Sequence, residues 1–290
     1  MANAKAWVLA SRPKTLSAAI VPVLIGTAMV LPREIHWALF ACTLLGSVFI
    51  QIGTNFVNDA LDFKKGADTG ERLGPLRVTQ AGLISAEAVL RGAYICFILA
   101  ALCGVPLIYR AGWPLMVIGI VSILAAYAYT GGPYPLAYNG LGELFVLLFF
   151  GFIAVGGTYY VQTQTMAGDV LLAGFAAGSL AVVLIAINNL RDIDGDRKSN
   201  KRTMAVRLGE PVARLEIAFF ALAPFAAIIA IAIWRGQRGL YLALLALPLA
   251  LALIVRVWRS RGAELNRCLA MAGALQWLAG ILFVIGCVLG

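Results

Sequence analysis

The stretch GDVLLAGFAAGSLAVVLIAINNLRDIDGD, residues 168–196, joins an apolar segment to an acidic one. Its first part, residues 168–190, is mostly apolar and long enough to cross a bilayer as a helix. Three aspartates and four basic residues follow: Asp192, Asp194 and Asp196, then Arg197, Lys198, Lys201 and Arg202. Because a helix C-terminus carries partial negative charge, each acid placed there loses about 0.3–1 kcal/mol. The stretch therefore predicts a membrane-spanning helix whose polar end holds something positive.

The apolar pattern of this stretch recurs along the whole chain. Of the 290 residues, 61% are hydrophobic and 13% are charged, which is outside the range of soluble globular domains. We predict nine spanning segments, at residues 16–31, 37–60, 88–109, 113–131, 139–161, 168–190, 212–234, 239–258 and 268–289. Continuous rather than alternating hydrophobicity favours helices over a barrel. We expect an all-α polytopic membrane protein, one transmembrane domain over residues 1–290, with the first segment retained rather than cleaved.

The net charge of +9 reflects membrane topology rather than nucleic-acid binding. With the N-terminus placed in the cytoplasm, nineteen of the 23 Lys and Arg residues fall in segments on the cytoplasmic side. This is the bias that orients membrane proteins. We therefore expect a cytoplasmic N-terminus, a bacterial cytoplasmic membrane, lipid as the surroundings and no nucleic-acid partner. Nothing in the sequence indicates an oligomeric state.

Two long cytoplasmic loops, 62–87 and 191–211, begin with the same spacing of polar residues. Asn58 precedes Asp62 by four positions, and Asn188 precedes Asp192 by four. The pair Asn55 and Asp59 repeats that spacing, and Asp196 adds one turn to the second set. Residues four apart share a helix face, and the two spans run in the same direction. Each span can therefore direct a polar stripe at one point.

Oxygen donors without nearby His or Cys suit a hard divalent cation, and Mg²⁺ is the usual one when a phosphate completes its shell. Basic residues follow each acidic cluster, as a diphosphate site requires. Of these we select Lys201, Arg77 and Lys64 as diphosphate ligands. The alternative is that the acids are solvated loop charges and the bases serve topology alone.

The sequences NDALDFKKGAD (58–68) and DIDGD (192–196) resemble the two aspartate-rich motifs of the UbiA-type intramembrane prenyltransferases. The third aspartate of the first motif falls at Asp68, where the wider family has it two positions earlier, at the place of Gly66. That departure, with RPKT (12–15), GPLRVTQAGLI (74–84) and GLGE (140–143), is similar to the menaquinone branch, whose acceptor is 1,4-dihydroxy-2-naphthoate. The resemblance covers residues 12 to about 210.

The resemblance implies Mg²⁺-dependent transfer of a polyprenyl group from its diphosphate to an aromatic acid, with decarboxylation to demethylmenaquinone. It implies two Mg²⁺ ions, held by Asn58, Asp59, Asp62, Asp68, Asn188, Asp192 and Asp196. Among these, Asp59, Asp62, Asp192 and Asp196 are the expected catalytic residues. The shifted Asp68 leaves open which carboxylate is the third ligand of the first motif.

Candidate acceptor-binding residues lie elsewhere. Arg12 and Lys14 stand at the start of the first span, where either can pair with an anionic acceptor. The tyrosine-rich segment 127–143 offers Tyr134, Tyr138 and Glu143 as cavity residues, whereas we interpret Tyr127 and Tyr129 as interfacial tyrosines.

Three other functions are compatible with parts of the pattern. The acceptor could be another aromatic compound, such as 4-hydroxybenzoate or homogentisate. A divalent-cation transporter could use the same Asp and Asn cluster, although such sites usually lie near the bilayer midplane. A phosphotransferase acting on CDP-alcohols also uses membrane aspartates, but its D-G-x-x-A-R pattern is absent from the sequence.

Overall fold

The computed structural model describes residues 4–66 and 73–290, and within these ranges the regular structure is entirely helical. The α-helices are α1 (Ala4–Ser11), α2 (Ser17–Ala28), α3 (Trp37–Lys64), α4 (Ala86–Ala111), α5 (Trp113–Ala128), α6 (Gly142–Val146), α7 (Ala154–Thr163), α8 (Gly168–Arg191), α9 (Ile193–Lys198), α10 (Met204–Arg235), α11 (Leu247–Arg259) and α12 (Leu265–Leu289). A π-helical segment, Leu147–Ile153, joins α6 to α7, and a 3₁₀ segment, Arg238–Ala246, leads into α11.

Each of the nine predicted apolar segments is helical, but not all are long enough to count as spans on their own. In the described part of the chain, seven helices are long and apolar enough to cross a membrane. An eighth span results if the N-terminal helices, which meet at a 52° bend before Ser17, are taken together. The apolar α5 is shorter than a full span. The all-helical polytopic fold is thus confirmed, and the number nine stays a prediction.

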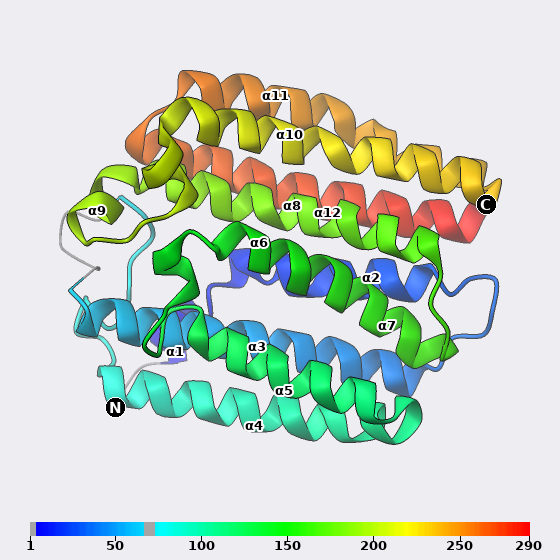
Figure 1. Cartoon of the computed structure of the whole chain (residues 1–290), viewed down its shortest axis with the longest axis horizontal. Helices are drawn as coiled ribbons and strands as arrows, with labels where there is room; N and C mark the ends of the chain where they lie inside the picture. The colour runs from blue at the N-terminus through cyan, green and yellow to red at the C-terminus, as the bar shows by residue number, and fades with distance from the viewer. Residues whose placement is uncertain (1–3, 67–72) are drawn as a thin grey trace.

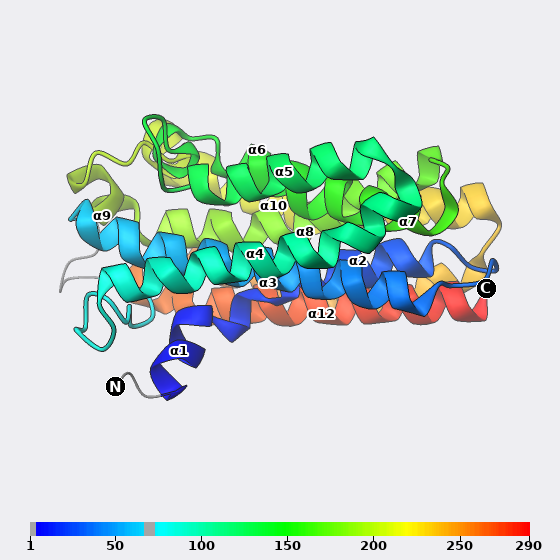
Figure 2. The same cartoon turned by 90° about the horizontal axis from the view of Figure 1, so that it is seen from below.

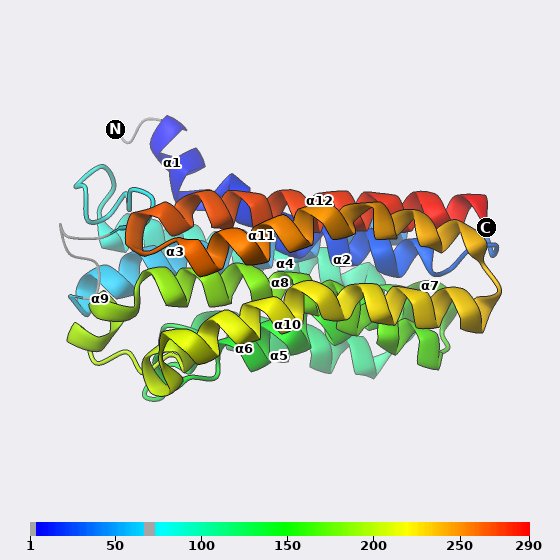
Figure 3. The same cartoon turned by 90° about the horizontal axis from the view of Figure 1, so that it is seen from above.

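The helices lie side by side along the longest axis of the molecule, as Figure 1 shows. One side consists of α3, α4 and α5, the other of α8, α10, α11 and α12, and α2 and α7 lie between them; Figures 2 and 3 show the same arrangement from below and above. In α8, 78% of the most apolar stretch is buried, against 6% for α3. Protein therefore surrounds α8, and its small residues allow close packing.

Both acidic motifs end their helices at the same end of the bundle. Figure 1 shows α3 and α8 running in the same direction, toward the end where α9 lies. The α3 helix ends at Lys64, and Gly66 turns the chain with a φ of 68°, a conformation that glycine adopts without strain. The α8 helix ends at Arg191, and Asp192 starts the turn into α9. The predicted parallel orientation of the two motif helices is confirmed.

Glycines allow α8 to approach the π-helical segment closely, and this contact yields a stability prediction. A Cβ atom on Gly178 would lie 2.8 Å from the Leu147 carbonyl oxygen and 2.9 Å from the Gly151 Cα. Since backbone atoms cannot move aside cheaply, Gly178→Ala is expected to destabilise the fold by about 1–3 kcal/mol. Thermal unfolding in detergent or nanodiscs measures this. Gly119→Ala is the matched control, because its Cβ would meet nothing within 4 Å, and an equal effect of both substitutions would contradict the prediction.

Candidate active site

A cavity of about 310 Å³ lies between the two sides of the bundle. Its walls come from α2 to α5, from α6, α7 and the π-helical segment between them, from α8, and from Arg12 and Thr15 before α2. Most of its lining is apolar, including Ile50, Phe149 and Phe150. Its polar residues include Asn58 and Asn188, the first asparagines of the two motifs. The matching motifs, 130 positions apart in sequence, therefore open into one chamber.

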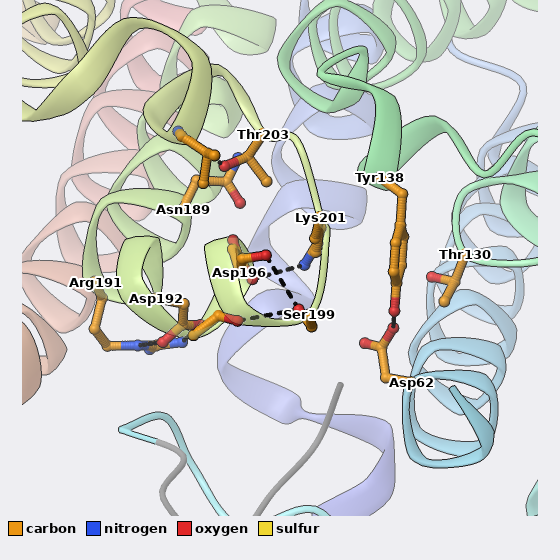
Figure 4. A network of polar contacts seen from close by, with 12 residues as sticks. Asp62, Thr130, Tyr138, Asn189, Arg191, Asp192, Asp196, Ser199, Lys201 and Thr203 are labelled. Carbon is orange, nitrogen blue, oxygen red and sulfur yellow. Dashed lines mark hydrogen bonds and ion pairs between the residues drawn. The ribbon is translucent and has the colours of Figure 1, made fainter. Parts of the chain in front are cut away.

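Asp62 lies at the end of α3 within a network of polar contacts (Figure 4). The Tyr138 hydroxyl donates a hydrogen bond of 2.9 Å to Asp62 Oδ1. The Arg77 guanidinium lies 3.5 Å from Asp62 Oδ2, and both side chains are buried. The loop segments that carry Arg77 and Tyr138 thus meet at this carboxylate.

Asp196 lies on the other side of the site, in α9. Figure 4 shows Lys201 and Tyr138 between Asp196 and Asp62. The Lys201 ammonium is 3.6 Å from Asp196 Oδ1, while the buried Oδ2 has no hydrogen-bond partner within residues 4–66 and 73–290. Burial raises the pKa of Asp196 to about 6, and the positive charge of Lys201 partly opposes the rise. An unpaired carboxylate oxygen in a buried position is one that a cation would stabilise.

Two lysines, one from each motif region, converge on the ring of Tyr138. The Lys65 ammonium is 4.5 Å from the ring centroid, and that of Lys201 is 5.6 Å from it. Lys65 also donates to the Thr130 carbonyl oxygen, and the Thr130 hydroxyl donates to Asn58 Oδ1. The loop between α5 and α6 therefore links the positive charges to the first motif.

The three aspartates of the second motif have different surroundings. Arg191 binds Asp192 with two hydrogen bonds, of 2.8 and 2.6 Å, and donates a third, of 2.9 Å, to Asn266. Asp194 points to solvent, with a side-chain exposure of 86%, and pairs with the exposed Arg197 at the surface. Of the three, Asp196 is the one directed toward Tyr138 and Lys201.

Asp59, predicted as a metal ligand and catalytic residue, is 1% exposed and bonded to the backbone of a loop. Its two oxygens accept hydrogen bonds from the amides of Val78 (3.2 Å) and Thr79 (2.9 Å). These bonds fix the segment that carries Arg77. The observed contacts are those of a loop anchor, and its metal contact stays a prediction.

The anchoring role of Asp59 can be measured without an activity assay. Asp59→Ala removes two charge-assisted hydrogen bonds, each of which contributes about 1.5–3 kcal/mol. We expect limited proteolysis to cleave the segment 73–84 at least about tenfold faster in this variant than in the wild type. Asp194→Ala, which removes a carboxylate from the surface, should cleave at the wild-type rate. Equal protection of this segment in Asp59→Ala would show that Asp59 does not hold it.

The donor set of the site suits a hard divalent cation. The possible ligand atoms are the carboxylate oxygens of Asp62 and Asp196 and the amide oxygens of Asn58 and Asn188. Of these, Asp196 Oδ2 accepts no hydrogen bond from the described residues. Over residues 4–66 and 73–290, no three or more His, Cys, Asp or Glu side chains are grouped closely enough to hold a metal by themselves. Asp68 lies outside the described residues. Amide and phosphate oxygens would therefore have to complete the shell, as is usual for Mg²⁺.

Lys64 is predicted as a diphosphate ligand, but the structure does not bring it to the site. Its ammonium pairs with Glu87 at 3.1 Å, and both side chains are exposed. The neighbouring Lys65 takes the place at the site instead. Helical spacing explains the difference, because Lys65 follows Asp62 by three positions and shares its face, whereas Lys64 follows by two. The helical repeat, if applied to the two lysines, would have selected Lys65 rather than Lys64 as the diphosphate ligand.

The predicted acceptor-binding residues divide into two groups. Arg12 lines the cavity, Tyr138 contacts Asp62, and the buried Glu143 accepts a 2.6 Å hydrogen bond from Asn189. Lys14 and Tyr134 are exposed and do not line the cavity, Tyr134 with 60% of its surface accessible. The roles of Lys14 and Tyr134 toward the acceptor therefore stay predictions.

Tyr129, interpreted from the sequence as an interfacial tyrosine, lines the cavity instead. Its hydroxyl would lie 3.1 Å from a Cβ on Gly142, so the glycine at the start of α6 leaves room for it. The glycine and proline turns that follow Tyr129 fold the α5–α6 loop back over the motifs, and periodicity alone could not have shown this.

Comparison with known proteins identifies the group to which the chain belongs. The UbiA prenyltransferase family matches residues 19–279, nearly the whole chain. The chain belongs to the UbiA prenyltransferase family. Among its UbiA relatives, the 1,4-dihydroxy-2-naphthoate octaprenyltransferase of Haemophilus influenzae is 37% identical, over 99% of this chain and 96% of that protein. The enzyme of the same name from Mycobacterium tuberculosis is also 37% identical, over 96% and 99%.

Solved structures of the UbiA family share the fold of this chain. The apo structure of a UbiA homologue from Aeropyrum pernix superposes with a TM-score of 0.72 at 15% identity, over 93% of this chain and 97% of that one. A UbiA homologue from Archaeoglobus fulgidus, bound to GPP and Mg²⁺, gives a TM-score of 0.66 at 12% identity, over 96% and 99%. The resemblance stated from the motifs is thereby confirmed, and the chain is a membrane-embedded prenyltransferase.

Proposed function

We propose that this prenyltransferase transfers a polyprenyl group from polyprenyl diphosphate to 1,4-dihydroxy-2-naphthoate, with loss of the carboxylate, to give demethylmenaquinol, which is oxidised to demethylmenaquinone outside this reaction. The naming of relatives that are 37% identical over nearly the whole chain supports this acceptor. The observation that carries the reaction class is a single apolar cavity that both acidic motifs enter through Asn58 and Asn188. The apolar part suits a prenyl tail, and the polar part suits its diphosphate.

The residues of the site would divide the work as follows. Asn58, Asp62, Asn188 and Asp196 would hold two Mg²⁺ ions, with Asp59, Asp68 and Asp192 as further ligands. When bound, Mg²⁺ neutralises the charge of the leaving diphosphate. Arg77, Lys65 and Lys201 add positive charge around the phosphate oxygens. The Archaeoglobus homologue of the same fold is bound to GPP and Mg²⁺, which supports a prenyl diphosphate and Mg²⁺ as ligands of this site.

The reaction breaks the allylic C–O bond and forms a bond to a ring carbon. The diphosphate leaves with the electron pair of that bond, and the electron-rich naphthol ring supplies the pair for the new C–C bond. Carbon dioxide then leaves from the ring carbon that has taken the prenyl group, and the electron pair of the broken C–C bond restores the aromatic ring, so that no ring proton has to be removed. Arg12, in the wall of the same cavity, would pair with the acceptor carboxylate before that step. The apolar walls exclude water from the allylic cation.

The orientation in the membrane is part of the proposal. We place the N-terminus in the cytoplasm, nine spans across a bacterial cytoplasmic membrane, and the active site at the cytoplasmic face. This follows the distribution of Lys and Arg.

A direct assay separates the candidate functions. The purified protein in nanodiscs would receive Mg²⁺, polyprenyl diphosphate and one of three acceptors: 1,4-dihydroxy-2-naphthoate, 4-hydroxybenzoate or homogentisate. The expected outcome is a prenylated naphthoquinol with loss of the carboxylate. Prenylation of 4-hydroxybenzoate or homogentisate in its place would identify another acceptor. Divalent-cation flux in proteoliposomes without any prenyl transfer would instead indicate a transporter.

A further inference from the structure

One polar group in the cavity is not used by the chemistry above. The Gln51 side chain, on α3, is 8% exposed, and its buried Oε1 atom has no hydrogen-bond partner among the residues that the structure describes. Gln51 also lines the cavity, whose lining is mostly apolar, for example at Ile50 and Phe149. A buried acceptor that lacks a donor is destabilising by about 1–3 kcal/mol, so a ligand that brings a donor would be favoured there.

The surrounding hydrogen bonds decide which end of the Gln51 amide faces the cavity. The Thr15 hydroxyl donates to the Arg12 carbonyl oxygen at 2.9 Å, and a carbonyl can only accept. Having used its proton, the hydroxyl must act as an acceptor toward its other neighbours. It accepts from Asn55 Nδ2 at 3.1 Å and from Gln51 Nε2 at 3.4 Å. The nitrogen of Gln51 therefore faces Thr15, and the oxygen is left for the cavity.

The position of this oxygen separates it from the diphosphate site. Gln51, Asn55, Asn58 and Asp62 follow one face of α3, at intervals of four, three and four residues. At 1.5 Å per residue, the backbone of Gln51 is about 16 Å from that of Asp62. Gln51 lies seven residues, or about two turns, from Asn58 on α3, and its amide meets that of Asn55 at one hydroxyl on the same network as Arg12.

The chemistry of the two substrates decides which of them this oxygen would contact. An ionised diphosphate only accepts hydrogen bonds, and a prenyl tail neither donates nor accepts. A phenolic hydroxyl is the one donor that the reaction brings. In 1,4-dihydroxy-2-naphthoate the 1-hydroxyl lies next to the carboxylate and bonds to it internally, so the 4-hydroxyl is the donor left over.

We propose that Gln51 determines specificity for the aromatic acceptor, its Oε1 accepting a hydrogen bond from a phenolic hydroxyl distant from the carboxylate, which Arg12 binds. The inference rests on the proposed function. Thr15 is the positioning residue that joins the two contacts, since it bonds both the Gln51 amide and the Arg12 carbonyl. A site built to bond a hydroxyl discriminates strongly against a ligand that lacks it.

The experiment compares equilibrium binding of 1,4-dihydroxy-2-naphthoate and 1-hydroxy-2-naphthoate, with Mg²⁺ and an unreactive prenyl thiodiphosphate present. Wild-type protein is expected to prefer the dihydroxy ligand about tenfold. In Gln51→Met the preference should fall to within about twofold. Thr43→Val is the control, because its hydroxyl lies in the same cavity but bonds its own helix at Leu39; it should keep the tenfold preference.

Each other outcome has a definite meaning. The role of Gln51 would be overturned if Gln51→Met kept the preference for the dihydroxy ligand, or lost affinity equally for both ligands. The proposed function would still stand in that case, provided that the prenyl transfer assay gives product. Should the variant not fold, wild-type protein with 1-hydroxy-4-methoxy-2-naphthoate decides, since equal binding of the hydroxy and methoxy ligands contradicts the proposal. If neither naphthoate binds and none is prenylated, both the proposed function and the role of Gln51 are contradicted.

Discussion

Asp196→Asn is expected to lower the rate of prenyl transfer by about 10²–10³-fold, the usual loss when one preorganised charge-stabilising group is removed. The substitution keeps the size of the side chain but removes the charge from the buried carboxylate whose Oδ2 has no hydrogen-bond partner in the described part of the chain. Without that charge the site holds metal and diphosphate less tightly as the C–O bond breaks. Single-turnover rates with saturating Mg²⁺ measure the effect.

Asp194→Asn is the matched control for this prediction. It lies two positions earlier in the same motif, but its side chain is 86% exposed and pairs with Arg197 at the surface. Exposed ion pairs contribute little, so its rate should stay within about twofold of the wild type. Equal rates for Asp194→Asn and Asp196→Asn would mean that the site does not use the geometry described here.

Lys65→Met is expected to raise the KM for the prenyl diphosphate by about 10–100-fold, because a hydrogen bond to a charged group contributes about 1.5–3 kcal/mol. The Lys65 ammonium lies over the Tyr138 ring, and the Tyr138 hydroxyl contacts Asp62. A diphosphate bound between Asp62 and Asp196 would be within reach of this charge. Steady-state kinetics with varied prenyl diphosphate give the value.

Lys64→Met tests the same charge one position away. Its loss breaks only the exposed pair with Glu87, so the KM should change by less than about twofold. A larger effect for Lys64 than for Lys65 would restore the assignment made from the sequence and remove Lys65 from the site.

Much of the fold follows from hydrophobic length alone. Apolar segments near twenty residues placed most of the predicted helices within a few residues of their observed positions, and the orientation indicated by the basic residues stays a prediction. The α10 helix is the clearest exception. It begins at Met204, eight residues before the predicted segment, and its regular backbone is broken at Gly209. Gly209, Glu210 and Pro211 separate the first turns of α10 from its long apolar run, so the hydropathy pattern did not indicate this extension.

The placement of site residues on helices could be predicted from their spacing in the sequence, whereas the contacts of site residues on loops could not. Spacings of four placed Asn58 and Asn188 correctly toward one cavity. The contacts of Tyr138, Arg77 and Lys201 come from loops that return to the motifs from elsewhere in the chain, and no local periodicity encodes that return. Burial of Glu143 against Asn189 likewise depends on how α6 packs on α8.

The central claim is that the tips of α3 and α8–α9 bind one metal–diphosphate complex between them. The most direct measurement is anomalous diffraction from crystals grown with Mn²⁺ and an unreactive prenyl thiodiphosphate. The account predicts manganese peaks between Asp62 and Asp196, with the diphosphate bridging ligands from both motifs. Manganese bound by one motif alone, or a diphosphate placed outside the space between the two tips, would contradict it.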